Sequence, residues 1–313
     1  MRRRLVSVSL VVAAIVGACV GEEAPNNVNV IVGGDGGTDG SSNPGDDSGG
    51  GTDSGGTDSG GSDGATDGGE GGTDGGAIGN VTGLAMWFSA DTGVGTNGLV
   101  VTSWTSHGGA PVVLTPIPGA TAPSVTANGI GGKPTIRLEG TPGNGACPCP
   151  GFTATLGVSQ PQPITVVTLV TKSRWSDATY NYNGTLFTDY IQADANRHKL
   201  QGYVAAGPSP TWALTGSSMI VTNGFTSNDY QATHVITAVL AAGSSLVRVD
   251  GVERATGNIG TAALGTNLVI GTDGSPIGSY QGEIAELAVF ARALSNAEMT
   301  AVEADLKFPY GLK

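Results

Sequence analysis

The sequence predicts an all-β fold for residues 80–313, built as an antiparallel sandwich or barrel. Short runs that are apolar throughout, or that alternate apolar and polar residues, recur along this part, and Gly, Pro, Asn and Asp fill the gaps. About 234 residues suit one large all-β domain. Only 13% of residues are charged and 53 are glycine, which fits many short strands joined by tight turns.

Residues 1–19 predict an export signal that ends at a lipidated cysteine. Three arginines precede an apolar run over residues 5–16, which is too short to span a bilayer as a helix. The run ends in VGAC, which resembles a bacterial lipobox with Cys19 as the lipidated residue. An ordinary secretory signal cut near Ala18 is the alternative.

The lipobox resemblance implies a location as well as a modification. Val20 follows Cys19 where an aspartate would favour retention at the inner membrane, so the resemblance points to the outer membrane and the cell surface. Several acyl chains on one cysteine would anchor the protein firmly, because a single chain gives only marginal binding. We therefore expect an exported, lipid-anchored protein that contacts the membrane through this anchor only.

Residues 20–79 predict a disordered acidic tether. The segment holds twelve acidic side chains and no Lys or Arg, in a chain whose formal net charge is -12. Residues 33–76 contain no Leu, Ile, Val or Phe, so the segment cannot offset its ordering entropy by burial. The same lack excludes a calcium-binding β-roll, which needs an apolar residue in each repeat. As a Gly-rich coil the tether would reach roughly 45 Å.

The domain reads as a series of short strands. In chain order, these are LAMWFSA, LVVTSW, PTIRLEG, ITVVTLVT, GTLFTDYI, HKLQGYVAA, MIVTNGF, THVITAVLAA, SLVRVDGVER, NLVIGT and GEIAELAVF. Asp250-Gly251 is a two-residue turn that favours positive φ, so it predicts a hairpin within SLVRVDGVER.

One helix is predicted, directly after the last strand. Ser295 and Glu298 have the spacing of a capping box, and Leu294 and Met299 that of a hydrophobic staple. The apolar face of this helix is formed by Met299, Val302 and Leu306. We expect the helix to pack on the sandwich.

Several stretches of residues 82–313 together point to a known family. They are GLAMWFSADTGV, VTSW with a glycine pair soon after, PSVTANGIGGKPTIRLEG, LVRVDGVER, NLVIGTDGS and, most specifically, GEIAELAVFARALSNAEMTAVEADLKFPYG. With these motifs the segment resembles a laminin-G-like domain of the concanavalin A-like lectin/glucanase superfamily. The resemblance implies a jelly roll of two packed antiparallel sheets, one of them curved.

Two departures bear on calcium, the one cofactor that the resemblance brings into consideration. Relatives often have an Asp before a Ser-Gly pair after the tryptophan, where this chain has Trp104-Thr105-Ser106-His107-Gly108. They often have Phe-Asp-Gly where it has Leu138-Glu139-Gly140. We therefore carry over no calcium site. Thr272-Asp273-Gly274 could contribute to a cation site, although a turn explains it fully.

Glu283 and Glu286 are the carboxylates to weigh for catalysis, because glucanases of this superfamily carry three acids on the equivalent strand. In a regular strand, residues three apart point to opposite faces. A bulge could bring the two together, but Ala285 stands where the middle acid would be expected. We therefore predict no catalytic residues and no enzyme activity, with a carbohydrate-active enzyme as the alternative.

Candidate ligand-binding residues lie in two segments that we interpret as loops. RWSDATYNYNG supplies Trp175, Asp177, Tyr180 and Tyr182, and SPTWAL supplies Trp212. Sugar binding uses aromatic faces beside amides and carboxylates. The alternative is that these aromatic residues pack the loops onto the sheet.

Cys147 and Cys149 are the two remaining cysteines once Cys19 is lipidated. In an exported protein they could close a very small disulfide ring or stay free in a loop. They have no partners at metal-ligand spacing, and the three histidines are widely separated. We therefore predict no metal site.

The function that these features favour is binding at a cell surface. Residues 80–313 carry fourteen acidic and eleven basic side chains, which gives no electrostatic footprint for nucleic acid. We expect the domain to bind a glycan or an extracellular protein. A structural component of the envelope that binds nothing is a further alternative, because this fold hosts many functions.

Overall fold

A computed structural model describes residues 77–139, 149–172, 184–189, 197–204, 210–222, 232–274 and 278–313. The predicted signal, with Cys19, and nearly all of the tether lie outside the described residues. None of the described helices is long and apolar enough to cross a membrane.

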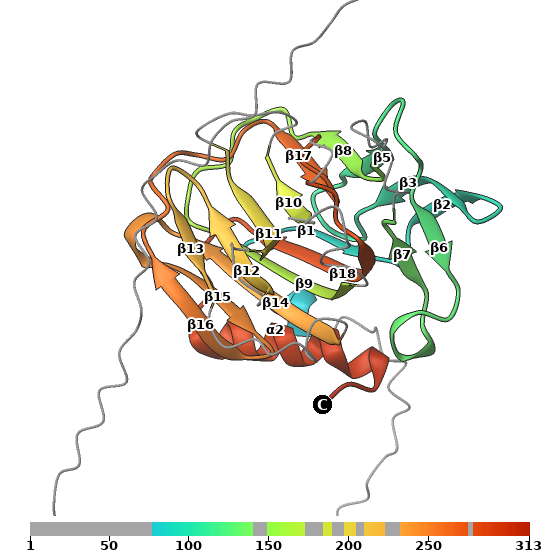
Figure 1. Cartoon of the computed structure of the whole chain (residues 1–313). Coiled ribbons are helices and arrows are strands. Elements are labelled where there is room, and N and C mark those ends of the chain that lie inside the picture. Colours follow the sequence, from blue (N-terminus) through green and yellow to red (C-terminus); the bar gives the residue numbers. More distant parts are fainter. Residues whose placement is uncertain are drawn as a thin grey trace, which may run out of the picture.

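The described residues form two layers of antiparallel strands, which confirms the predicted sandwich (Figure 1). The first layer, called sheet B, has the order β13-β12-β11-β10-β17-β8-β5. Its strands are β5 (Val113–Pro116), β8 (Phe152–Thr155), β10 (Thr185–Thr188), β11 (Lys199–Val204), β12 (Pro210–Thr215), β13 (Met219–Val221) and β17 (Asn267–Ile270).

The second layer, called sheet A, has the order β16-β15-β14-β9-β18-β1-β4. These strands are β1 (Leu84–Ser89), β4 (Gly108–Gly109), β9 (Ile164–Lys172), β14 (Thr233–Leu240), β15 (Ser245–Val249), β16 (Val252–Gly257) and β18 (Gly282–Phe290). The start of β18 also pairs with β7 (Thr135–Arg137), which continues through β6 (Ser124–Thr126) to β3 (Val100–Thr105) and β2 (Val94–Asn97). The two sheets join at β5, which pairs with both β3 and β8.

The main core lies between the two sheets. Its largest fully buried side chains include Trp104, Trp212, Tyr280, Phe88 and Phe152. The indole Nε1 of Trp104 donates to the backbone oxygen of Ser89 at 2.8 Å, so this buried polar group is satisfied.

A second apolar cluster lies on the other face of sheet A, where the C-terminal helix α2 (Asn296–Lys307) covers it (Figure 1). As predicted, Met299, Val302 and Leu306 are the buried apolar face of α2. The short helix α1 (Ala77–Asn80) contributes Ile78 to the same cluster, and the Ile78 backbone N–H donates to Asp305 Oδ2 at 3.0 Å. Within the described residues, packing against α2 therefore already includes Ile78.

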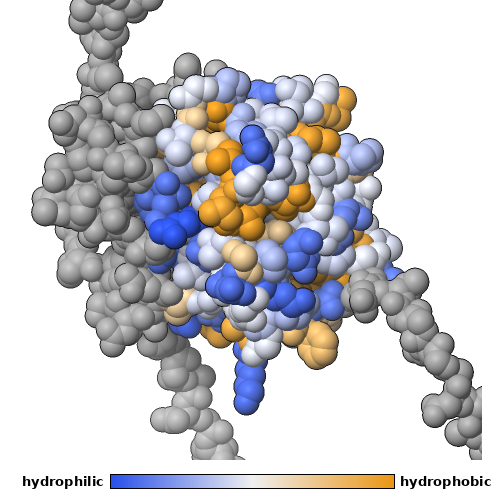
Figure 2. All heavy atoms as spheres, turned by 90° about the vertical axis from the view of Figure 1, so that its right-hand side faces the viewer, coloured by the Kyte–Doolittle hydropathy of each residue, from blue (hydrophilic) through white to orange (hydrophobic). Residues whose placement is uncertain are grey.

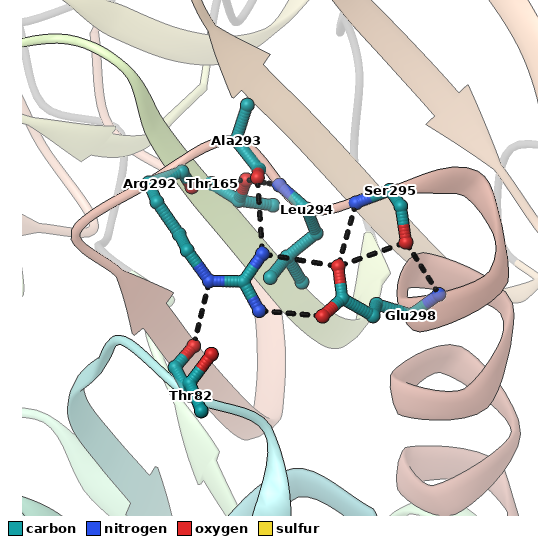
Figure 3. A network of polar contacts seen from close by, with 7 residues as sticks. All are labelled: Thr82, Thr165, Arg292, Ala293, Leu294, Ser295 and Glu298. Atoms are coloured by element: carbon teal, nitrogen blue, oxygen red, sulfur yellow. Dashed lines mark hydrogen bonds and ion pairs between the residues drawn. The ribbon is translucent and has the colours of Figure 1, made fainter.

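The predicted capping box at the start of α2 is confirmed (Figure 3). Ser295 Oγ accepts from the Glu298 backbone N–H at 3.3 Å, and Glu298 Oε2 accepts from the Ser295 backbone N–H at 2.8 Å. Arg292 adds a bidentate pair to Glu298, at 2.6 and 3.0 Å, and its Nε donates to the Thr82 backbone oxygen at 2.8 Å. The Ser295 hydroxyl also donates to Glu298 Oε2, at 2.8 Å. The guanidinium, the Ser295 backbone N–H and the Ser295 hydroxyl together lower the pKa of Glu298 to about 2. Contacts among residues 292–298 thus fix the start of α2 close to the end of β18.

The predicted hairpin is also confirmed. Asp250 and Gly251 join β15 to β16 with φ values of 52° and 84°, which is the pair of positive φ angles that such a two-residue turn requires. Three short 3-10 turns complete the described structure: η1 (Ile130–Gly132), η2 (Ala242–Ser244) and η3 (Phe308–Tyr310).

Candidate functional site

Most of the predicted binding residues lie outside the described residues. These are Trp175, Asp177, Tyr180 and Tyr182, all within the connection 173–183 between β9 and β10. Both ends of that connection are described, at Lys172 and at Gly184. The binding prediction for these four residues therefore stays a prediction. The structure describes only the two residues at which the connection starts and ends.

The structure corrects the location of Trp212, which the sequence analysis placed in a loop. Trp212 belongs to β12, pairs with Gly202 of β11, and is only 1% exposed. Its ring centroid lies 6.5 Å from that of Tyr280 inside the main core. A side chain so placed packs the sandwich and offers no open face for stacking on a sugar.

Cys149 is buried and disulfide-bonded. Cys147 lies outside the described residues, so the predicted pairing of these two cysteines stays a prediction.

A buried lysine marks the end of the sandwich where the connection 173–183 begins. Lys172 is the last residue of β9 and shares its parity with Val170, so it points between the sheets. Its Nζ lies 5.0 Å from the centre of the Tyr280 ring. Burial lowers the pKa of Lys172 to about 7. A Cβ on Gly184 would clash with this Nζ, so a side chain there would force the end of the lysine to move.

Next to Lys172, the outer face of sheet B carries buried and half-buried polar side chains on β10, β11 and β12. We call this surface the polar face, and its residues are Thr185, Thr188, Lys199, Gln201 and Thr215. Four of its polar atoms have no hydrogen-bond partner among the described residues: Thr185 Oγ1, Thr188 Oγ1, Gln201 Oε1 and Thr215 Oγ1. Strand pairing sets Thr188 opposite Lys199 and Lys199 opposite Thr215, while Thr185 lies opposite Gln201. The side chains therefore form two neighbouring rows across the three strands.

A β-bulge in β10 assembles the polar face. The register shifts between Thr185 and Phe187, so Leu186 is an extra residue in this strand. Leu186 and Phe187 both enter the main core, and Thr185 and Thr188 both face outward although they are three residues apart. Without the bulge, one of the two hydroxyls would point into the core.

The cation on the polar face is paired. Lys199 Nζ donates to Asp273 Oδ2 at 2.8 Å, and these side chains are 8% and 3% exposed. Arg197 Nη1 lies 3.8 Å from the same oxygen. Burial lowers the pKa of Lys199, and the neighbouring Asp273 carboxylate opposes that effect. Asp273, weighed above as part of a cation site, thus binds protein cations.

The structure also corrects the placement of Glu283 and Glu286. The parity of a regular strand predicts that they lie on opposite faces of β18, but the strand has a register shift at Ala285. Glu283 therefore lies opposite Thr171 and Glu286 opposite Leu169, which share one face of β9. The bulge that could bring the two carboxylates to one face is present.

Each of these carboxylates is nevertheless held by its own neighbours. Glu283 accepts hydrogen bonds from the hydroxyls of Thr126 and Thr135, at 3.2 and 2.8 Å. The contacts to Glu286 come from Trp87 Nε1 at 2.8 Å, Ser89 Oγ at 2.7 Å and Tyr310 OH at 2.7 Å. Burial raises the pKa of Glu286 to about 7, although these three contacts oppose the rise. Glu286 thereby links β1, β18 and the C-terminal turn.

No metal ligands mark a site in the described regions, and one cavity there is small. These residues contain no group of three His, Cys, Asp or Glu side chains that could hold a metal ion. An apolar cavity lined by Met86, Phe187, Leu264 and Val289, among others, holds about 20 Å³, which is room for little more than one water molecule.

The side of the molecule formed by β2, β3, β5, β6 and β7 faces the viewer in Figure 2, where apolar residues gather near the middle of a mostly polar surface. Leu99, Val100 and Val113 are exposed apolar side chains on or beside these strands. Single exposed apolar side chains are common on soluble proteins. The polar face therefore remains the stronger candidate site.

Comparison with known proteins agrees with this architecture. A laminin-G family model, described as "Concanavalin A-like lectin/glucanases superfamily", matches residues 193–300. The match supports the resemblance over this segment. It includes β11 and β12 of the polar face, together with Asp273. No curated protein matches the chain.

Two solved structures share the fold at low sequence identity. The binding domain of Paraclostridial Mosquitocidal Protein 1 is 13% identical with a TM-score of 0.51, covering 71% of this chain and 52% of that one. The binding domain of botulinum neurotoxin DC, in complex with rat synaptotagmin II, is 10% identical with a TM-score of 0.50, covering 74% and 53%. This chain thus spans about half of each toxin domain. Domain 4 of AbnA, an extracellular arabinanase from Geobacillus stearothermophilus in complex with arabinotriose, is 16% identical with a TM-score of 0.48, covering 71% and 97%.

The residues of the polar face were not predicted from the sequence. The alternation in HKLQGYV does indicate that Lys199 and Gln201 share one side of a strand. Nothing in the sequence indicates that this side is buried, or that Thr188 and Thr215 lie on the neighbouring strands beside Lys199.

Proposed function

We propose that this protein is a surface-anchored binding protein, with a lipid anchor at Cys19, a spacer over residues 20–79, and a jelly roll that binds a glycan or an extracellular protein through the polar face. The observation that carries the proposal is the set of four buried polar atoms without partners among the described residues, on Thr185, Thr188, Gln201 and Thr215. Buried polar atoms are nearly always hydrogen-bonded. A bound hydroxyl-rich ligand would supply the partners that the described chain does not.

The arrangement of layers suits presentation at a surface. Helix α1 follows the proposed spacer and packs with α2 on the outer face of sheet A. The polar face is the outer face of sheet B, so it lies on the opposite side of the sandwich. A spacer that enters beside α2 would therefore leave the polar face directed away from the membrane.

Among the alternatives, binding is better supported than catalysis by the known contacts. Glu283 and Glu286 are both hydrogen-bonded by neighbouring side chains. A catalytic acid and its nucleophile need access to the same sugar linkage. The polar face, by contrast, offers groups that the described chain leaves unbonded and that a ligand could use.

The polar face can be tested with Thr188→Val and Thr215→Val in the full-length protein. Replacing an unbonded buried hydroxyl by a methyl of similar shape should leave stability unchanged or raise it. If the hydroxyls bind the ligand, each variant should weaken binding to the glycans that the wild type selects on an array, by about tenfold for a lost contact of 1.4 kcal/mol.

Thr102→Val, at an exposed position of β3, is the matched control, and its binding should equal that of the wild type. If the two polar-face variants bind as the wild type does, the hydroxyls contact only ordered water and the site assignment is wrong. An array that shows no glycan binding, with or without calcium, would leave an extracellular protein as the proposed ligand.

The anchor has its own test. Metabolic labelling with a fatty acid should mark the wild-type protein, and Cys19→Ser should abolish the label because the acyl chains attach to this thiol. Cys147→Ser is the control and should keep the label. A Cys19→Ser protein that is labelled as strongly as the wild type would exclude the lipobox.

A further inference from the structure

Two carboxyl groups, those of Glu286 and Asp91, are joined through the hydroxyl of Ser89. Glu286 lies on β18 and is 5% exposed, whereas the Asp91 side chain, just after β1, is 37% exposed. Ser89 Oγ lies 2.7 Å from Asp91 Oδ1 and 2.7 Å from Glu286 Oε1. Tyr310 OH lies 2.7 Å from the same Glu286 oxygen. A chain of three short oxygen–oxygen contacts thus runs from the buried Tyr310 to the exposed Asp91.

These contacts require one hydrogen more than the two hydroxyls carry. An oxygen–oxygen distance of 2.7 Å is that of a hydrogen bond, with one hydrogen between the two atoms. Ser89 and Tyr310 supply one hydrogen each, and three contacts need three. Trp87 Nε1 adds none, because it donates to the other oxygen of Glu286, at 2.8 Å. The third hydrogen therefore belongs to a carboxyl group.

Of the two carboxyl groups, Glu286 is the one that carries the hydrogen. Burial raises the pKa of Glu286 to about 7, and the nearby Asp91 contributes to the rise. The ionised form of Asp91 is stabilised by solvent and by two neighbours. Lys133 Nζ lies 3.9 Å from Asp91 Oδ2, and Thr92 Oγ1 donates to Asp91 Oδ1 at 3.0 Å.

The other titratable groups around Glu286 do not supply this hydrogen. His107 lies against Trp87, with the ring centroids 4.1 Å apart, and burial lowers the pKa of His107, so it is mostly neutral at pH 7. Burial also raises the pKa of Tyr310, which therefore keeps its own proton. Glu283, on the same face of β18, is bonded by threonine hydroxyls of β6 and β7.

With the hydrogen on Glu286, all three contacts are satisfied in one direction. Tyr310 donates to Glu286, Glu286 donates to Ser89, and Ser89 donates to Asp91. When Glu286 ionises, Ser89 has a single hydrogen for two carboxylates, so one of its contacts must lengthen. Glu286 is buried and bonded from β1 and η3, so the exposed Asp91 is the partner that moves.

We propose that Glu286, Ser89 and Asp91 form a pH-sensitive latch, in which a neutral Glu286 holds Asp91 through Ser89 and an ionised Glu286 releases it. Asp91 lies in the connection between β1 and β2, residues 90–93. The latch therefore fixes this connection to β18 at acidic pH and frees it above neutral pH. This regulation does not depend on the proposed function.

Infrared difference titration of the full-length protein locates the proton. Ordinary carboxyl groups are ionised above about pH 6, so a neutral-carboxyl band that is lost near pH 7 marks the latch. Glu286→Gln should abolish this band. Asp91→Asn should move its loss to lower pH by about one unit, because the new amide can donate to Ser89 and Ser89 can then donate to an ionised Glu286. Glu253→Gln, at an exposed carboxylate of β16, is the control and should leave the band unchanged.

Amide hydrogen exchange at Thr92 measures the release, because the Thr92 backbone N–H donates to the Ser89 backbone oxygen at 3.3 Å within this connection. Corrected for the intrinsic rate, wild-type protection should fall about fivefold between about pH 6 and about pH 8, as for the loss of one hydrogen bond. Glu286→Gln should keep the higher protection at both pH values, since its amide donates at either.

Three results would overturn the latch. The first is a wild type without a neutral-carboxyl band above about pH 6, a measurement that needs no variant to fold. The second is a band that survives in Glu286→Gln and is lost in Asp91→Asn, which would place the proton on Asp91. The third is Thr92 exchange that depends on pH equally in the wild type and in Glu286→Gln.

Discussion

The stability of this protein is expected to pass through a minimum near pH 7 because two buried groups have pKa values displaced in opposite directions. Glu286 has its pKa raised from 4.5 to about 7. Between these values the folded protein keeps a proton that the unfolded chain has lost, so the free energy of unfolding falls as pH rises. Lys172 has its pKa lowered from 10.5 to about 7. Above pH 7 the unfolded chain keeps the proton that the folded protein has lost, so stability rises again up to about pH 10.

Urea unfolding of the full-length protein across this pH range checks the expectation. Raising or lowering a pKa by one changes the free energy of unfolding by about 1.4 kcal/mol, so each arm of the curve should span a few kcal/mol. Glu286→Gln should flatten the acidic arm alone, and Lys172→Met the alkaline arm alone. If neither variant changes the slope on its own side, the two side chains have ordinary pKa values in the folded protein.

Loss of the Glu303 carboxylate is expected to be among the most destabilising single changes. Glu303 projects from α2 onto sheet A, where Arg248 Nη2 donates to Oε2 at 3.1 Å and Thr237 Oγ1 donates to Oε1 at 2.7 Å. The Arg248 and Glu303 side chains are 8% and 4% exposed. Glu303→Ala leaves a buried guanidinium without its counter-ion, which should cost about 3–5 kcal/mol in the free energy of unfolding.

The matched comparison is the double variant Arg248→Met with Glu303→Leu. Because it removes both charges and keeps the volume, it should be more stable than Glu303→Ala. Chemical denaturation of the wild type, Arg248→Met, Glu303→Leu and the double variant gives the coupling energy. If the decreases in the free energy of unfolding of the two single variants add up to that of the double variant, Arg248 and Glu303 do not stabilise the protein as a pair.

Features set by neighbouring residues were predictable from the sequence. The turn at Asp250-Gly251 needs positive φ at two consecutive positions, and the cap of α2 needs Ser295 and Glu298 three residues apart. Both requirements involve only residues close together in the sequence, so they apply wherever the segment lies in the fold. The strands in the predicted runs, such as β14 and β15, were predictable for the same reason, since alternation of side chains is local. Strands β2, β5, β6, β8 and β12 lie outside those runs and were not predicted.

Features set by bulges were not predictable. Leu186 in β10 and Ala285 in β18 are ordinary apolar residues for a strand, and nothing in their neighbourhood indicates an extra residue. Each bulge nevertheless moves a side chain to the other face: Thr188 joins Thr185, and Glu286 joins Glu283. Trp212 was misplaced for a related reason, because the prolines on either side of Ser209 favour a loop. Pro210 is instead the first residue of β12, a position that strands tolerate.

Local periodicity, turn chemistry and composition depend on residues close together in the sequence, so they can be recognised from the sequence alone. They were enough to predict an all-β sandwich closed by one capped helix, with few charges and an acidic segment before it. Which polar side chains share a buried face depends instead on strand pairing between segments far apart, such as Thr188 with Lys199, and on contacts such as Lys199 with Asp273. The three-dimensional fold was needed to find the candidate site, because those distant pairings bury groups whose hydrogen bonds the described chain leaves open.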